Sequence, residues 1–164
     1  MFVRELHLRD FRSWPRVDVE LASGPVIITG RNGFGKTNLV EALFYLATLR
    51  SHRVSTDAPL VRSSATSALV TATVENAGRE LTASLQINAE GSNKAWLNTA
   101  PQRRPRDLLG VLRAVLFAPR ISSSYEAIRV TVDASSMSLS HNVVHDSPRH
   151  AQTMTRCCDN VRRC

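Results

Sequence analysis

One stretch, VIITGRNGFGKTNL from Val26 to Leu39, constrains the fold of this chain more than any other part of the sequence. Its spacing fits G-x-x-x-x-G-K-[ST] between Gly30 and Thr37, the pattern of a phosphate-binding loop. The β-branched run PVIIT precedes the loop and is typical of a strand buried on both faces. After the loop, apolar residues recur at helical spacing: Leu39, Val40, Leu43, Phe44, Leu46 and Ala47. The stretch therefore predicts a strand, a glycine loop and a helix, which is the nucleus of an α/β fold.

Each position of this loop has a physical task. Gly30, Gly33 and Gly35 allow positive φ angles and let backbone N–H groups approach phosphate oxygens closely. With the positive end of the following helix, these groups would form an anion cradle. Lys36 would place its ammonium against the β- and γ-phosphates, and the Thr37 hydroxyl would be a ligand of Mg²⁺. An ordinary glycine turn is the alternative, but the strand before the loop and the helix after it favour phosphate binding.

The rest of the chain up to Pro119 is predicted to be mostly strands. FVRELHL and RVDVEL alternate apolar and polar residues, so we expect antiparallel partners joined by the turn DFRSWP. ALVTATVENAGRELTASLQI predicts a hairpin that turns at Asn76 to Gly78, and NKAWLN predicts a further strand. The basic segment APQRRPRD is expected to be a linker, followed by a short helix LLGVLRA and an apolar strand VLFAP.

Charge and targeting signals narrow the class of protein. The chain has 21 Lys and Arg against 14 Asp and Glu, a net charge of +7, which favours a polyanionic partner such as nucleic acid. The N-terminus lacks the apolar core of a signal peptide, and no apolar run approaches the ~20 residues of a membrane span, so we expect a cytoplasmic protein. Cys157, Cys158 and Cys164 match no common zinc spacing, so no metal site is expected there.

The form of the loop, GRNGFGKTN with Asn32 and Asn38, resembles that of SMC-like and ABC-type ATPases. The segments LHLRDFRSWPRVDVEL, GKTNLVEALFYLATLRSHRVSTDAPLVR and RRPRDLLGVLRAVLFAP extend the resemblance to the RecF family of bacterial DNA replication and repair proteins, in its actinobacterial style. The resemblance covers Met1 to Pro119. It implies a truncated P-loop NTPase of α/β class, an ABC/SMC-head-like N-terminal lobe with an antiparallel β subdomain.

The resemblance also implies a function and site residues. The intact family would be cytoplasmic ATPases that bind ATP and Mg²⁺ and form ATP-dependent homodimers. They would bind single-stranded, gapped and double-stranded DNA. With RecO and RecR, they would act in replication, recombinational repair and the SOS response. Thr37 would hold the metal. The residues that would bind the cofactor are Gly30, Arg31, Asn32, Gly33, Phe34, Gly35, Lys36, Thr37 and Asn38.

Arginines are the candidates for further contacts. Arg12 and Ser13 in FRS and Arg53 in SHR match family positions that would touch nucleotide or DNA. For the two arginines, the alternative is that they are solvated surface charges. The other nucleic-acid candidates are Arg103, Arg104 and Arg106.

Beyond Pro119 the sequence departs from the family. Residues 120–164 are rich in serine and histidine without a sustained period, so we divide the chain into a partial ATP-binding lobe, residues 1–119, and a non-homologous, largely disordered tail. The family's serine-glycine signature and Walker B strand are missing from the sequence. IRVTVD, which ends at Asp133, alternates polar and apolar residues and is rejected as Walker B. Permitted codons from Ile121, read in a shifted frame, spell LVVVRGDP, so we interpret the tail as a frameshift or a sequencing error in a recF gene.

These departures leave two functions open. The first is a RecF-type ATP-binding and DNA-binding protein of which this chain carries the Walker A lobe only. The second is a non-catalytic fragment with weak, salt-sensitive binding of polyanions. No catalytic residue is assigned, because ABC-type hydrolysis depends on positioned charges from the missing motifs. A generic P-loop kinase is a distant third reading, since nothing after the helix supplies a lid or an acceptor site.

Overall fold

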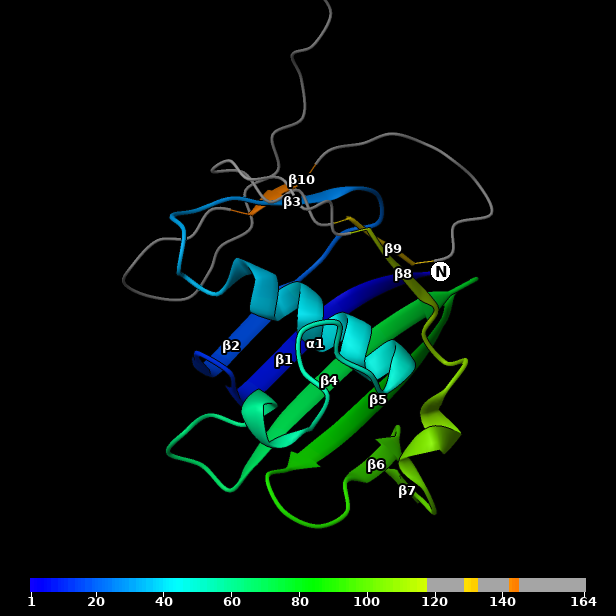
Figure 1. Cartoon of the computed structure of the whole chain (residues 1–164). Helices are drawn as coiled ribbons and strands as arrows, with labels where there is room; N and C mark the ends of the chain where they lie inside the picture. Colours follow the sequence, from blue (N-terminus) through cyan, green and yellow to red (C-terminus); the bar gives the residue numbers. More distant parts are fainter. Residues whose placement is uncertain (118–128, 133–141, 145–164) are drawn as a thin grey trace, which may run out of the picture.

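The computed structural model describes residues 1–117, 129–132 and 142–144, and its main body is an antiparallel sheet with one helix across one face (Figure 1). The spatial order of the six strands is β2-β1-β4-β5-β6-β7, and every neighbouring pair is antiparallel. The strands are β1 (Phe2–Phe11), β2 (Trp14–Glu20), β4 (Ser67–Asn76), β5 (Arg79–Asn88), β6 (Lys94–Leu97) and β7 (Ala100–Gln102). This sheet confirms the predicted antiparallel β subdomain.

The core lies between this sheet and helix α1 (Lys36–Thr48). Because side chains alternate along a strand, β1, β4 and β5 each send an apolar row toward the helix. Leu8, Val70 and Leu85 of the apolar rows are fully buried. The predicted helix is confirmed, and among its apolar residues Leu43 and Phe44 are only half-buried, while Glu41 is fully buried. The buried face of the helix therefore includes a carboxylate as well as apolar side chains.

Both predicted hairpins are confirmed, and tight turns fix their registers. Between β1 and β2, Phe11 pairs with Trp14, so only Arg12 and Ser13 form the turn. Between β4 and β5, Asn76 pairs with Arg79, and the turn residues Ala77 and Gly78 have φ angles of 51° and 76°. Two consecutive positive φ angles match the right-handed twist of the flanking strands.

The strand before the glycine loop, β3 (Val26–Ile28), lies apart from the six-stranded sheet (Figure 1). It pairs in parallel with β10 (Asn142–Val144), while β8 (Ala114–Phe117) pairs in antiparallel fashion with β9 (Arg129–Val132). Ile27 is 41% exposed, and Val26 and Ile28 are half-buried. The prediction that this strand is buried on both faces is therefore wrong, since no described layer covers the Ile27 side.

The basic segment after β6 is not a linker, which corrects a second prediction. Ala100–Gln102 add the edge strand β7, and Pro105–Leu108 form the 3-10 helix η2. The backbone N–H of Arg104 donates to the Asp107 carboxylate at 3.0 Å, which caps η2. The short helix predicted for LLGVLRA is absent from this part of the described chain, because Gly110 takes a φ of 95° that a right-handed helix does not allow. The apolar strand predicted after it is confirmed as β8.

Two short strands, β9 and β10, lie within the segment 120–164 that we predicted to be a largely disordered tail. Asp133 and the three cysteines lie outside the described residues. The division of the chain at Pro119 and the frameshift interpretation therefore remain predictions. Among the residues with described structure, no helix has the length and apolar character needed to cross a membrane.

Candidate phosphate-binding site

The glycine loop connects the end of β3 to the start of α1. Gly30, Gly33 and Gly35 have φ angles of 145°, 86° and 83°, as the sequence predicted for a loop that turns its amides inward. Gly35 is the N-cap of α1, and no side chain caps this end of the helix by a hydrogen bond. The first turn of α1 thus presents its backbone and the positive end of its dipole to the loop.

Lys36 lies across the loop. Its Nζ donates hydrogen bonds to the carbonyl oxygens of Gly30 at 2.7 Å and Arg31 at 2.8 Å. The ammonium group is therefore held at the concave side of the loop. The charge of Lys36 and the helix N-terminus act on the same small volume, which favours an anion there.

Gly35 is also contacted by the β1–β2 turn and by the first residue of β2. Trp14 Nε1 donates a hydrogen bond to the Gly35 carbonyl oxygen at 3.1 Å. A Cβ atom at Gly35 would lie 2.7 Å from Trp14 Nε1 and 2.8 Å from Ser13 Oγ. Glycine is therefore required here twice, by the left-handed backbone and by the close approach of the turn.

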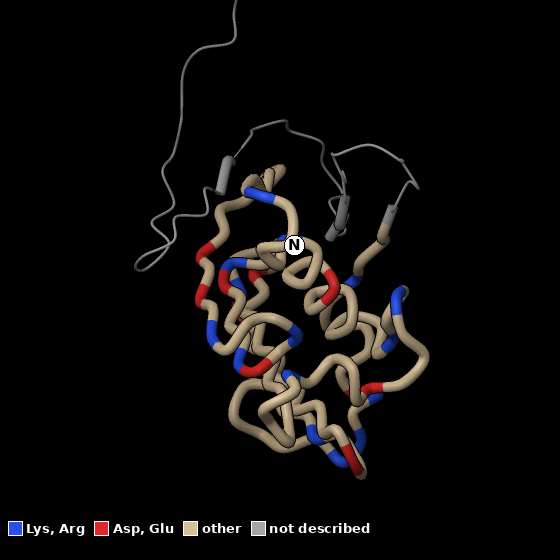
Figure 2. The backbone as a smooth tube through the Cα atoms, turned by 60° about the vertical axis from the view of Figure 1, so that its left-hand side comes forward, with Lys and Arg blue, Asp and Glu red and all other residues tan. Residues whose placement is uncertain are grey.

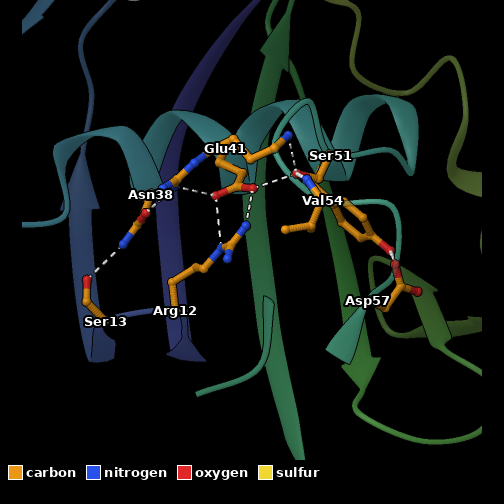
Figure 3. A network of polar contacts seen from close by, with 9 residues as sticks. Arg12, Ser13, Asn38, Glu41, Ser51, Val54 and Asp57 are labelled. Atoms are coloured by element: carbon orange, nitrogen blue, oxygen red, sulfur yellow. Dashed lines mark hydrogen bonds and ion pairs between the residues drawn. The ribbon is translucent and has the colours of Figure 1, made fainter. Parts of the chain in front are cut away.

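The same turn contacts the first turn of α1 through Ser13. Asn38 Nδ2 donates to Ser13 Oγ at 2.8 Å, and Asn38 Oδ1 accepts a hydrogen bond from Arg53 Nη1 at 2.9 Å (Figure 3). Asn38 thereby links the β1–β2 turn to the segment after α1. Its amide is already used on both sides, so its structural role is independent of any ligand.

Glu41, one helical turn further along α1, is the centre of a buried charged network (Figure 3). Arg12 donates to it from Nε at 3.1 Å and from Nη2 at 2.7 Å, and Ser51 Oγ donates at 2.6 Å. Arg53 Nη1 adds a fourth hydrogen bond at 3.1 Å. Burial opposes the charged carboxylate, but the hydrogen bonds from Arg12 and Ser51 outweigh it and keep the Glu41 pKa below its ordinary value.

This network shows how the side chains of two candidate arginines, Arg12 and Arg53, are paired. The Arg12 side chain is only 15% exposed and the Arg53 side chain 43% exposed, and both pair with Glu41. Arg12 is therefore half-buried and paired, whereas Arg53 is exposed and also pairs with Glu41. With one carboxylate between two guanidinium groups, the cluster keeps a net positive charge beside the glycine loop.

An open hollow lies beside Asn38, in the first turn of α1. It combines charged and polar side chains from the β1–β2 turn and α1 with apolar ones from the segment around the 3-10 helix η1 (Ala58–Leu60). The lining residues are Arg12, Ser13, Asn38, Arg53, Ala58, Pro59, Val61 and Ser63.

A second polar cluster holds the segment that carries Arg53. Tyr45 donates its hydroxyl hydrogen to Asp57 at 2.5 Å, and Asn93 Nδ2 donates to the other Asp57 oxygen at 2.6 Å. Burial, and then the hydrogen bond to Asp57, raise the pKa of the Tyr45 phenol above its ordinary range. Asp57 thus joins α1, the 3-10 helix η1 and the loop before β6.

The structure brings only some of the predicted residues together. Arg12, Ser13 and Arg53 line one hollow with Asn38, and Phe34 of the loop is 50% exposed. The exposed residues Arg103, Arg104 and Arg106 lie at β7 and η2, at the sheet edge opposite β2. In the view of Figure 2, basic and acidic segments alternate along the tube instead of gathering on one side.

Sequence reasoning missed three residues: Trp14, Glu41 and Ser51. For Glu41 the signal was available, because a carboxylate within the apolar run NLVEALFYLA needs a buried partner. For Trp14 and Ser51 the sequence contains no such sign, since each acts through a contact with a residue far along the chain.

Known proteins that are similar in sequence or in fold identify the family of this chain. A family profile described as the RecF/RecN/SMC N-terminal domain matches residues 2–141. A structure of the recombination mediator protein RecF with ATP, from the RecFOR pathway, superposes with a TM-score of 0.67 at 27% identity. An Smc head domain from Pyrococcus furiosus, bound to the C-terminal domain of ScpA, gives 0.58 at 25% identity over 66% of this chain and 31% of that chain.

A third likeness shows the fold alone. The SMC head domain from Thermotoga maritima gives a TM-score of 0.57 at 23% identity over 69% of this chain and 43% of that chain. The RecF match covers 72% of this chain and 33% of that chain, so this chain spans about a third of the RecF structure. The likenesses confirm the predicted fold class, the N-terminal lobe of an SMC-type ATPase head.

Proposed function

This chain belongs to the RecF/RecN/SMC N-terminal domain family, and on that premise we propose that its glycine loop binds the phosphates of ATP. The observation that carries the proposal is the position of the Lys36 ammonium, 2.7 Å from the Gly30 carbonyl oxygen and at the N-terminus of α1. When phosphate binds, its charged oxygens would replace the carbonyl oxygens of Gly30 and Arg31 as acceptors for the Lys36 ammonium. Charged acceptors bind an ammonium more strongly than neutral ones.

The chemistry of the loop fits a nucleoside triphosphate. The backbone of Gly33 to Thr37 and the Lys36 ammonium would hold phosphate oxygens, and the hollow beyond Asn38 would take the nucleoside. Thr37 would contribute its hydroxyl to Mg²⁺, which neutralises charge on the phosphates when it is bound. The residues of this chain bind and orient the nucleotide; turnover is not part of the proposal, because the sequence lacks the Walker B and signature motifs.

The wider function is proposed for the protein of which this lobe is part. It is a cytoplasmic, RecF-type protein that binds ATP and DNA in replication, recombinational repair and the SOS response, with RecO and RecR as partners and an ATP-dependent homodimer as its working form. The family membership and the likeness to RecF of the RecFOR pathway support this assignment.

The test is calorimetric titration of Mg·ATP into the 164-residue chain. Lys36→Ala should abolish measurable binding. Lys94→Ala is the matched control, because Lys94 is the only other lysine, is exposed, and lies on β6. Equal affinities of the two variants and the unmodified chain would contradict the proposal.

A second candidate function is weak polyanion binding by a non-catalytic fragment. The net charge of +7 and the exposed arginines at β7 and η2 favour it. In that case single-stranded DNA would bind with strong salt dependence, and neither Mg·ATP nor Lys36→Ala would change its affinity. A change of DNA affinity on addition of Mg·ATP would instead favour the RecF-type function.

A further inference from the structure

We propose that Trp14 is a positioning residue of the phosphate-binding loop. Its indole N–H holds the Gly35 carbonyl group and thereby directs the backbone N–H of Lys36 into the loop. The proposal rests on the proposed binding of phosphate by this loop. It assigns a task to a side chain that contacts the last glycine of the loop, whereas the Lys36 ammonium contacts Gly30 and Arg31.

The first step concerns the hydrogen bonds that the Gly35 carbonyl oxygen accepts. It accepts hydrogen bonds from Trp14 Nε1 at 3.1 Å, from the Asn38 backbone N–H at 2.9 Å and from the Leu39 backbone N–H at 3.3 Å. Two of these donors belong to the helix itself. Trp14 is the donor that comes from another element, β2, and so it fixes the helix start relative to the sheet.

The second step is the planarity of the peptide bond between Gly35 and Lys36. The described chain has no cis peptide bond, so the Gly35 C=O and the Lys36 N–H point in opposite directions. A contact that holds the carbonyl against Trp14 therefore holds the amide hydrogen on the loop side. The helix hydrogen bonds from Asn38 and Leu39 hold the same carbonyl, and the indole N–H adds a donor from β2 that further restrains a residue able to populate both hands of the backbone.

The third step is the rigidity of the tryptophan. Trp14 is the first residue of β2, and its indole is half-buried. The two preceding turn residues are bound to α1 through the pairs Arg12–Glu41 and Ser13–Asn38. At Gly35, the site of a Cβ atom would lie 2.9 Å from Trp14 Cε2, so the ring also occupies the space beside this residue. A flip of the Gly35–Lys36 peptide would lose the indole hydrogen bond together with those from Asn38 and Leu39, and would turn a carbonyl dipole toward the phosphates.

The experiment compares Trp14→Phe with Trp96→Phe. Trp96 is the other tryptophan, is also half-buried, and lies on β6, away from the loop. In ¹⁵N-labelled, ligand-free chain, Trp14→Phe should shift the Lys36 backbone amide resonance, whereas Trp96→Phe should leave it unchanged. In calorimetry, Trp14→Phe should weaken binding of inorganic triphosphate with Mg²⁺ about three- to tenfold, the effect of one hydrogen bond.

A second variant separates the hydrogen bond from packing. In the Trp96→Phe background, Trp14 is replaced by benzothienylalanine, which has the shape of tryptophan with sulfur in place of the N–H group. This variant should fold like its parent and show the same amide shift and loss of affinity. An unchanged Lys36 resonance, or an affinity equal to that of the parent, would overturn the proposal.

The proposal and the proposed function fail in different ways. If the unmodified chain binds no triphosphate, the proposed function is wrong, and the ligand-free amide spectrum still decides the role of Trp14. If the chain binds triphosphate and the benzothienylalanine variant binds equally well, the loop binds phosphate and Trp14 does not position it.

Discussion

Arg12 reaches both carboxylate oxygens of Glu41, from Nε at 3.1 Å and from Nη2 at 2.7 Å, and the Glu41 side chain is fully buried. The two lie 29 positions apart in the sequence. This pair fastens the β1–β2 turn to the helix that follows the glycine loop. Ser13 and Trp14, the next two residues of the chain, add contacts to Asn38 and Gly35. Three consecutive side chains thus support the proposed phosphate site from one turn.

Removal of the Glu41 carboxylate should destabilise the fold. Glu41→Ala would leave the guanidinium groups of Arg12 and Arg53 without their shared acid, and breaking such a pair costs about 3 kcal/mol of unfolding free energy. Urea unfolding followed by circular dichroism measures the change. Glu90→Ala removes an exposed carboxylate and should cost less than about 0.5 kcal/mol. Equal losses would show that the network adds nothing to stability.

The contribution of Glu41 should depend on pH in one direction. Its pKa in the folded chain lies below the ordinary value of 4.5, so the stability it adds is complete above that value and is lost as the pH falls through the folded pKa. The difference in unfolding free energy between the unmodified chain and Glu41→Gln should therefore be constant from pH 8 to 6 and shrink below about pH 4.5. Asp18, whose pKa is also lowered, first of all by its hydrogen bond to His7, is present in both chains and cancels in the difference. A difference that grows with acidity would contradict the assignment.

Two loop glycines should respond differently to alanine. Both Gly33 and Gly35 have positive φ, which costs a non-glycine residue about 1–2 kcal/mol. At Gly33 a Cβ atom meets nothing within 4 Å, whereas at Gly35 it would collide with Trp14 and Ser13. Gly35→Ala should thus lower the unfolding free energy by clearly more than Gly33→Ala. Thermal or urea unfolding of the two variants side by side decides this.

The hydroxyl of Tyr45 should stabilise the segment that carries Arg53. Tyr45→Phe removes the donor to Asp57 and leaves that carboxylate with Asn93, at a cost of about 1–3 kcal/mol. Hydrogen exchange should become faster in the segment that contains Arg53 and η1. A double-mutant cycle with Asn93→Ala should show coupling, because both side chains act on one carboxylate. Additive effects would mean that the two contacts are independent.

The arginines at β7 and η2 offer a test of DNA binding. If they contact phosphates, the double variant Arg103→Ala, Arg106→Ala should weaken binding for all sequences and reduce the salt slope by about one unit per lost contact. The control removes two exposed arginines from other strands, Arg9 and Arg79. Fluorescence anisotropy with labelled DNA over a salt series gives both slopes. Identical slopes for the two double variants would show that β7 and η2 carry no specific contact.

Local patterns were sufficient for much of the fold. Alternation placed β1 and β2, and the turn at Asn76 to Gly78 placed the hairpin of β4 and β5, because period-two burial and positive φ are properties of a few neighbouring residues. The same local spacing located the glycine loop and α1. It failed at β7 and η2, where basic and proline residues suggested a linker although the chain turns back after Leu97 and pairs Ala100–Gln102 with β6.

The sequence by itself determined the glycine loop, its lysine and the antiparallel hairpins, since each depends on residues within about one turn or one strand pair. Only the tertiary structure decided what supports the loop. Trp14 and Gly35 are 21 residues apart, and Arg12 and Glu41 are 29 apart. No periodicity relates such pairs, because their contact exists only once the sheet and α1 have packed together. The buried charge of Glu41 and the need for glycine at position 35 therefore follow from the fold as much as from the motif.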